Sequence, residues 1–154
     1  MNLFTSMSIS AKGLRAERTR LNIASMNLAN AHVTRTIDGG PYRAKSVVFR
    51  SVPMKEESML PEDVQDSTRD FDSQLSSALE AVEVADIVDD KTPFMEVFDP
   101  SHPDADENGI VKLPNVNVME QMVDLIDAQR AYEANISAMD AAKTMAIKAI
   151  DIIR

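Results

Sequence analysis

Apolar residues recur every seven positions at both ends of the chain. The N-terminal series is Met7, Leu14, Leu21 and Leu28, and the C-terminal series is Val118, Leu125, Tyr132, Met139, Ala146 and Ile153. A repeat of about 3.5 residues keeps one stripe of a helix facing a partner helix. The pattern predicts two terminal helices that pair as a coiled coil, with each other or with neighbouring copies. We extend the predicted seam by Met122, Ile136 and Ile150.

Local signals place these helices at residues 5–31 and from Asn117 onwards. Ser6 or Ser8 can cap the first helix, and Asn30 is suited to end it. Asn117 and Glu120 have the spacing of a capping box. Residues 116–154 contain no Gly or Pro, so one helix of more than about 30 residues is allowed. The shorter first helix cannot cover its whole apolar stripe, which predicts partners outside the chain.

The middle of the chain predicts a small β-rich part with a loop insert. A turn at residues 38–41 precedes expected strands at 42–52, 82–88 and 94–98, which together predict a subdomain of three or more strands. Residues 53–80 form an acidic, serine-rich insert that buries little apolar area, with the option of a short helix near its end. The expected fold is α+β, mainly α. Residues 1–35 with 115–154 form a terminal-helix domain, and residues 36–114 form an outer subdomain.

Charge narrows the possible partners. The chain has 154 residues, enough for one domain, and a formal charge of −9. Residues 1–31 carry four basic and one acidic residue, whereas residues 32–115 carry eight basic and eighteen acidic residues. The basic first helix favours pairing with the more acidic last helix, and the acidic middle argues against nucleic acid or anionic lipid. No apolar run predicts a membrane span or a cleaved signal peptide.

Few residues carry candidate chemistry. Asp104, Asp106, Asn108 and Gly109 match the first half of an EF-hand calcium loop, but the twelfth position is Asn115 where a bidentate Glu is required. A polar turn between strands is the simpler interpretation, and a calcium-dependent binding module stays as the alternative function. His32 and His102 are far apart in the sequence, and there is no cysteine. A hydrolase using acids of the middle segment has no supporting motif, so we expect no enzyme and no cofactor.

Both terminal segments resemble the paired signatures of the bacterial flagellar rod and hook family. The similar blocks are residues 21–31 and 120–135, and residues 41–49, 98–106 and 111–116 are most similar to proximal-rod members. The larger members' Gly-rich block after the first helix is absent. The family pattern is carried by Asn22, Asn27, Ala29, Asn30, Tyr42, Glu120, Arg130, Tyr132 and Asn135.

This resemblance implies a non-enzymatic building block of the flagellar basal body. In such proteins the terminal helices form the inner layer of a hollow shaft that transmits motor torque. The implied route is export through the flagellar type III apparatus, without a cleaved signal, to the periplasm. The implied partners are copies of the chain, adjacent proximal-rod, distal-rod and rod-base adaptor subunits, and the surrounding membrane ring or bushing.

Overall fold

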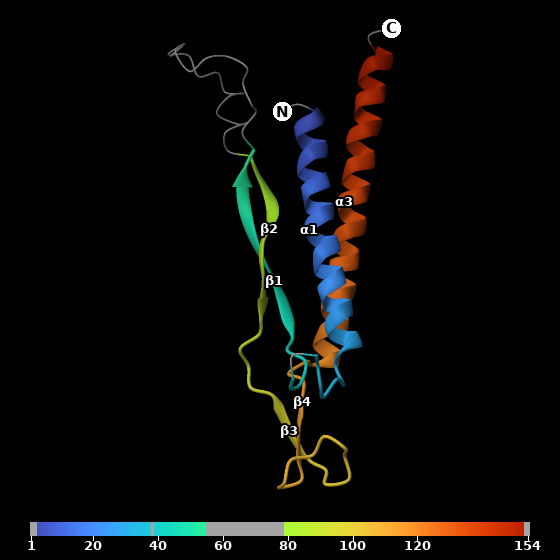
Figure 1. Ribbon diagram of the computed structural model, residues 1–154. Coiled ribbons are helices and arrows are strands. Elements are labelled where there is room, and N and C mark those ends of the chain that lie inside the picture. The colour runs from blue at the N-terminus through green and yellow to red at the C-terminus, as the bar shows by residue number, and fades with distance from the viewer. Residues whose placement is uncertain (1–2, 38, 55–78, 153–154) are drawn as a thin grey trace, which may run out of the picture. The chain divides into compact units, whose positions relative to one another are not determined.

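The computed structural model describes residues 3–37, 39–54 and 79–152. These residues form two long helices, and four strands lie between the helices in chain order (Figure 1). The elements are α1 (Leu3–Ala29), β1 (Lys45–Pro53), β2 (Glu80–Asp89), β3 (Met95–Phe98), β4 (Ile110–Leu113) and α3 (Val118–Ile152). The expected α+β, mainly helical class is confirmed. Most of the predicted acidic insert and Ile153 lie outside the described residues.

The helix α1 begins earlier than its sequence predicted. It starts at Leu3, so the expected caps Ser6 and Ser8 lie inside the helix and that prediction is wrong. No Gly or Pro lies between Leu3 and Ser8, so nothing prevents the helical hydrogen bonds from extending towards the N-terminus. The other end falls where expected. The side chain of Asn30 donates from Nδ2 to the carbonyl oxygen of Met26 at 2.8 Å, which satisfies a carbonyl of the last turn.

The helix α3 begins at the predicted cap. Oδ1 of Asn117 accepts a hydrogen bond from the backbone N–H of Met119 at 3.1 Å. The backbone of Gln121 then donates to the carbonyl oxygen of Asn117 at 3.0 Å, which is the first bond of the helical series. The helix runs for 35 residues. Over the described residues, no helix is both long and apolar enough to cross a membrane.

The strands form two separate ribbons. β1 pairs with β2, and β3 pairs with β4 in antiparallel register from Met95 opposite Leu113 to Phe98 opposite Ile110. The predicted three or more strands are present as four among the described residues, and they are divided between two two-stranded sheets. No bounds were predicted for the short strand β4, although the interpretation of residues 104–109 as a turn between strands implies a strand after them. Strand pairing is a long-range relationship, and local sequence patterns do not fix which strands are neighbours.

Contacts divide the chain into two compact units. One contains the described parts of residues 1–16, 49–83 and 132–154, and the other contains those of residues 17–48 and 84–131. The division crosses α1, α3 and the β1–β2 ribbon, so each unit holds segments of both helices and of both strands. The predicted separation into a terminal-helix domain and an outer subdomain stays a prediction.

Candidate assembly interface

The two helices contact each other within each unit, and they run in opposite directions. In one unit Gly13 lies so close to Asn135 that an added Cβ would be 2.9 Å from its Oδ1. In the other, Nη2 of Arg20 donates to Oδ1 of Asp124 at 2.8 Å. Later positions of α1 thus meet earlier positions of α3 (Figure 1). The expected pairing of the terminal helices is present within one chain.

The electrostatic part of this pairing is modest. The Arg20 and Asp124 side chains are 33% and 41% exposed, so solvent and salt screen their attraction. Exposed or half-exposed pairs of this kind contribute about 0.2 to 1 kcal/mol. The ion pair therefore favours the observed register of the helices without accounting for the stability of the pair.

Asn27 is the centre of a buried polar network. Its side chain is 1% exposed and is the largest fully buried one among the described residues. Nδ2 donates to the carbonyl oxygen of Lys45 at 2.7 Å and to Oε1 of Gln121 at 2.9 Å. Oδ1 accepts from the backbone N–H of Lys45 at 3.0 Å and from the hydroxyl of Tyr42 at 2.9 Å. The amide uses all four of its hydrogen-bonding positions, and so it joins α1, α3 and the start of β1.

Burial and a nearby carboxylate favour the neutral form of the Tyr42 phenol. Burial raises its pKa above the ordinary value of 10.0, and the negative charge of Asp89 raises it further. A phenolate would lose the proton that Tyr42 donates to Asn27. The protonated side chain is therefore the one that fits the native packing.

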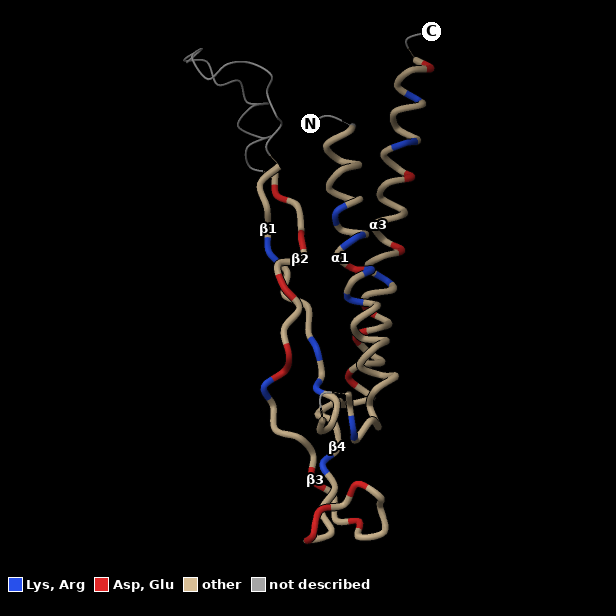
Figure 2. The backbone as a smooth tube through the Cα atoms, in the orientation of Figure 1, with Lys and Arg blue, Asp and Glu red and all other residues tan. Residues whose placement is uncertain are grey.

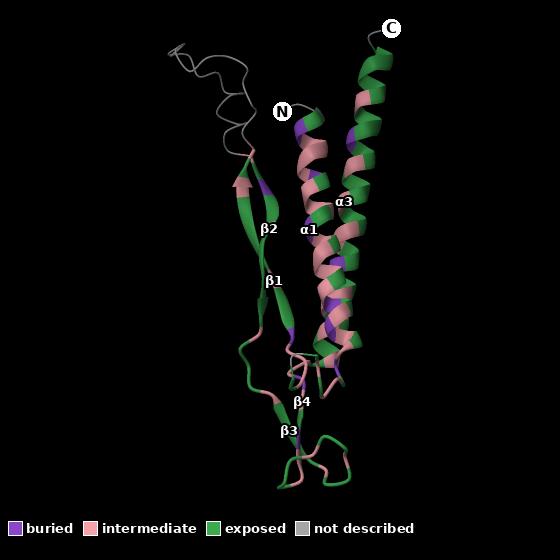
Figure 3. Ribbon diagram, in the orientation of Figure 1, coloured by how far each residue is buried: buried purple, intermediate pink, exposed green. Residues whose placement is uncertain are grey.

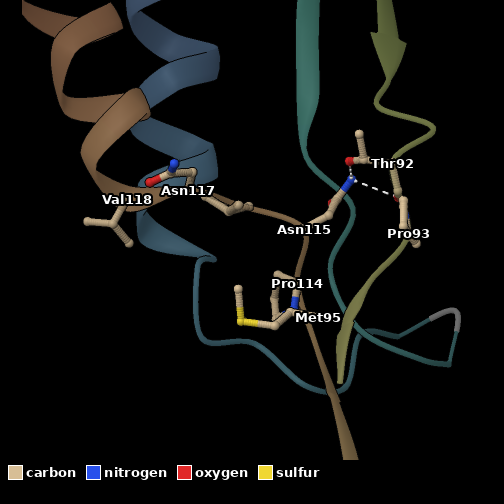
Figure 4. Close-up of a pocket in the computed structure, with 8 residues that line it drawn as sticks. Thr92, Pro93, Met95, Pro114, Asn115, Asn117 and Val118 are labelled. Carbon is tan, nitrogen blue, oxygen red and sulfur yellow. Dashed lines mark hydrogen bonds between the residues drawn. The ribbon is translucent and has the colours of Figure 1, made fainter. Parts of the chain in front are cut away.

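A second polar network surrounds Asn115, just before α3. Its Oδ1 accepts from the backbone N–H of Ala44 at 2.8 Å. Its Nδ2 donates to Oγ1 of Thr92 at 2.8 Å, as Figure 4 shows. The guanidinium of Arg43 donates to the carbonyl oxygen of Asp90 at 2.6 Å and lies 4.4 Å from the ring centre of Phe94. These contacts attach the ends of β1 and β2 to the segment that leads into α3.

An open pocket adjoins Asn115 at the start of α3. Thr92, Pro93, Met95 and Pro114 lie around it with Asn117 and Val118 (Figure 4). The lining is mostly apolar, and it contains no His, Cys, Asp or Glu. The hydroxyl of Thr92 is the one side-chain hydroxyl in this lining, and it accepts a hydrogen bond from Nδ2 of Asn115.

The predicted seam residues are only partly buried in the single chain. Nine are half-buried: Met7, Leu14, Leu21, Leu28, Val118, Leu125, Tyr132, Met139 and Ala146. Met122, Ile136 and Ile150 are exposed, at 45%, 40% and 68%. Their role as a subunit interface stays a prediction, since only an assembled structure has the partner surface.

Close contacts between the helices involve small and polar residues that the apolar seven-residue series did not include, although the family pattern contains Asn27 and Asn135. On α1 these residues include Gly13 and Asn27, and on α3 they include Gln121 and Asn135. The other buried helix residues are small as well: Thr5, Ser10, Ala16, Ala24, Ala128 and Ala142. Small side chains allow two backbones to approach closely, whereas large ones hold them apart. The seven-residue spacing of 121, 128, 135 and 142 is a sequence signal for these contacts.

Large apolar side chains on α3 are left exposed. Near its start Met119, Val123 and Ile126 follow helical spacing and are 71%, 56% and 49% exposed. Towards its end the exposed residues include Met145, Ile147 and Ile152. Figure 3 shows exposed positions along much of α3. A long helix with an uncovered apolar face is typical of a subunit that buries that face against a partner.

The remaining family-pattern residues divide between buried and exposed positions. Asn22, Ala29, Glu120 and Arg130 are exposed, while Asn30, Tyr42, Tyr132 and Asn135 are half-buried. The exposed members have no structural task that the helix pair explains. Their place in the family pattern stays a prediction of the resemblance.

The half-matched calcium loop forms the connection between β3 and β4. Oδ2 of Asp104 accepts a hydrogen bond from Oγ1 of Thr34 at 2.8 Å, and Gly109 turns the chain with φ of 73°. At its start, hydrogen bonds from the side chain and backbone of Ser101 lower the pKa of Asp99. Among the described residues, no group of three or more His, Cys, Asp or Glu side chains is arranged to hold a metal ion. The loop is a polar turn between strands, as the simpler interpretation expected.

An antiparallel pair of terminal helices with an uncovered apolar face defines a class of helical assembly subunits. Comparison with known proteins specifies the family. Residues 107–152 match the family described as "Flagellar basal body rod FlgEFG protein C-terminal". The chain is similar along its length to curated proteins called "Flagellar basal-body rod protein FlgC". It is 37% identical to that of Borreliella burgdorferi, covering 100% of this chain and 99% of the relative.

Two further relatives have the same name. The chain is 38% identical to the FlgC protein of Bacillus subtilis, covering 99% of both chains. It is 36% identical to that of Salmonella typhimurium, covering 99% of this chain and 98% of the relative. The chain therefore belongs to the FlgC family of flagellar basal-body rod proteins. The resemblance inferred from the sequence is confirmed, and the family is one of structural proteins rather than enzymes.

Proposed function

We propose that this chain is a structural subunit of the flagellar basal-body rod and that its terminal helices polymerise into the inner layer of the shaft. The observation that carries the proposal is its end-to-end similarity to FlgC rod proteins of three distant bacteria. In this assembly the chain contacts copies of itself and other rod proteins. A hollow shaft built of paired helices is suited to transmitting motor torque, because each helix is stiff along its axis.

The exposed face of α3 supports an assembly role. Met119, Val123 and Ile126 present apolar surface that α1 leaves uncovered. Burying such surface against a neighbour is favourable by about 25 cal/mol for each Å² removed from water. A contact that repeats head to tail without closing generates a helical filament. We assign the proximal part of the rod as the location of this filament, in the periplasm.

The two-part organisation follows from this assignment. Residues 1–35 with 115–154 form the inner helical domain, and residues 36–114 form the outer subdomain. The outer part is then placed to meet a surrounding membrane ring or bushing. Adjacent proximal-rod, distal-rod and rod-base adaptor subunits contact the ends of the helices. The chain reaches this position through the flagellar type III export apparatus without a cleaved signal.

Complementation of a strain that lacks its own copy of this gene tests the proposal. Val123→Asp places an unpaired carboxylate on the proposed contact face, where burial is costly. The chain should still be synthesised and exported, but swimming and recovery in purified basal bodies should be lost. Asp127→Asn is the matched control, since Asp127 is an exposed polar residue on the next turn of the same helix. Normal rods containing the Val123→Asp chain would contradict the proposed interface.

A further inference from the structure

The β1–β2 ribbon has two outer edges without a partner strand in the part of the chain that the structure describes. It is a two-stranded sheet, held at one end by the hydrogen bond from Asp90 N to Ala44 O and at the other by that from Met54 N to Leu79 O. These bonds give the two strands opposite directions. The outward backbone N–H and C=O groups of an edge strand can pair with another strand. An isolated two-stranded ribbon is also marginally stable, so additional strands stabilise it.

The two strands carry charges of opposite sign. β1 contains two basic residues, Lys45 and Arg50, and no acidic residue. β2 contains four acidic residues and no basic residue: Glu80, Glu83, Asp86 and Asp89. The segregation holds separately in each compact unit, because each contains one base of β1 and two acids of β2. Figure 2 shows the basic positions on β1 and the acidic positions on β2.

Apolar side chains on the ribbon are open to solvent as well. Val48 and Phe49 on β1 are exposed, and so are Val82, Ile87 and Val88 on β2. Neighbouring residues such as Val48 and Phe49 point to opposite faces of a strand, so both faces of the ribbon carry apolar surface. Strands with apolar residues on both faces are typical of the interior of a larger sheet.

Charge decides which partner fits these edges. Two β1 edges repel each other, and so do two β2 edges, whereas a β1 edge attracts a β2 edge. A second copy of this chain in the same orientation offers the matching edge. Its β1 then lies antiparallel to the first copy's β2, with the same geometry as the pairing inside the ribbon. The contact uses different surfaces on the two copies, so it repeats without closing.

We propose that the ribbon pairs edge to edge between copies of this chain, with the basic β1 of one copy beside the acidic β2 of the next. This inference rests on the proposed function, because it names copies of the chain as neighbours in the rod. It adds a second contact that is separate from the helical layer. The attraction is electrostatic and solvent-exposed, so it sets the order and direction of neighbours more than the total affinity.

Charge exchange between full-length chains tests the pairing. Variant A carries Lys45→Glu and Arg50→Glu, so that both edges are acidic. Variant B carries Glu83→Lys and Asp86→Lys, so that β2 gains basic residues opposite the basic β1. At about 0.05 M salt, each variant alone should self-associate at least about tenfold more weakly than the unaltered chain in sedimentation velocity. At about 0.5 M salt the difference should shrink, because screening removes the charge term.

Mixing distinguishes an intermolecular contact from damage inside one chain. Arg50 and Glu83 also approach each other within the ribbon, at 3.4 Å, and each single variant breaks that pair. An equimolar mixture of A and B keeps the internal pair broken in both chains. It offers the basic β1 of B to the acidic β2 of A, and the acidic β1 of A to a β2 of B whose positions 83 and 86 are basic, although Glu80 and Asp89 of B stay acidic. The mixture should therefore associate within about threefold of the unaltered chain. Weak association of the mixture would overturn the proposal. The outer edges of β1 and β2 would then either be free or bind a different protein.

Two controls complete the experiment. Lys91→Glu changes an exposed charge outside the strands, and it should leave association unchanged. Circular dichroism of A and B should match the unaltered chain. Incorporation into basal bodies separates this inference from the proposed function. If A and B enter rods normally and associate normally, the ribbon pairing is wrong while the rod assignment stands. If the unaltered chain itself does not enter rods, the rod assignment is wrong.

Discussion

The hydroxyl of Tyr42 donates a 2.9 Å hydrogen bond to Oδ1 of Asn27, although the two residues lie on opposite sides of a chain reversal. Gly39 and Gly40 make that reversal with φ of 82° and 93°, a conformation that side chains disfavour. The bond places the start of β1 against the buried side of α1. The end of the first helix and the start of the strand are thus fixed by one amide.

Replacing Asn27 by Ala should be strongly destabilising. The change removes four hydrogen bonds and takes away the Asn27 partner of part-buried groups at Lys45, Gln121 and Tyr42. We expect a loss of about 2 to 4 kcal/mol in the free energy of unfolding, measured by urea denaturation. Asn22→Ala is the matched control on the same helix, because Asn22 is exposed. Equal stability of the two variants would show that the network is not important for the fold.

The raised pKa of Tyr42 predicts a stability loss at high pH. Its native pKa lies above the ordinary value of 10.0, so the unfolded chain releases the proton first as pH rises. The contribution of the neutral phenol is complete below about pH 10 and is lost as pH rises through the native pKa. Tyr42→Phe should unfold with about 0.5 to 1.5 kcal/mol less stability at neutral pH. Denaturation curves should show a smaller decline above pH 10 for Tyr42→Phe than for the unaltered chain.

The contact between Gly13 and Asn135 predicts a conditional effect of Gly13→Ala. Ala is favoured over Gly inside a helix by about 1 kcal/mol. In the unaltered chain the new Cβ would lie 2.9 Å from Oδ1 of Asn135, so the helices must shift or the side chain must move. The gain should therefore appear only in the Asn135→Ala background, where the space is open. Thermal unfolding of the two single variants and the double variant measures this coupling, and additive effects would contradict it.

The glycine at the β3–β4 connection should tolerate substitution poorly. Gly109 has φ of 73°, and an added Cβ would lie 3.0 Å from the Phe98 ring and 3.1 Å from Pro100. Gly39 is the matched control, since its φ is also positive but no atom lies within 4 Å of its added Cβ. Gly109→Ala should cost about 1 kcal/mol more than Gly39→Ala in urea denaturation. Equal costs would mean that the loop adjusts freely around Phe98.

The helices were predictable because their signals are local. The two seven-residue series, which include Leu21 and Leu125, show helical periodicity directly. Asn117 indicates the start of α3, because its side chain is suited to cap a helix. The small and polar residues between α1 and α3 could not be predicted from these apolar series, because a hydrophobic pattern selects large side chains. The helices instead meet closely at Gly13 and near Ala128, where bulk is absent.

The sheet and the polar networks depend on residues that are far apart in the sequence. Asn27 and Gln121 are separated by 94 positions, and Ala44 and Asn115 by 71. Neither pair has a local pattern that identifies the partner. The family resemblance did single out Asn27 and Tyr42, and the structure supplies a physical reason for both. The structure also shows that β1 pairs with β2 and that β3 pairs with β4 in a second sheet. Local strand propensity could not predict this pairing.

The alanine-rich contact between the helices has a thermodynamic consequence. Each buried methyl group contributes only about 0.8 kcal/mol, so residues such as Ala24, Ala128 and Ala142 stabilise the pair far less than leucines in their place would. Several larger apolar side chains of α3, such as Met119 and Val123, are exposed in the single chain, and the proposed polymer would remove them from water. By mass action, the melting temperature of this protein then depends on its concentration. If neighbouring subunits cover these side chains as proposed, we expect dilute chains to melt at a lower temperature than concentrated ones, which calorimetry over a range of protein concentrations would measure.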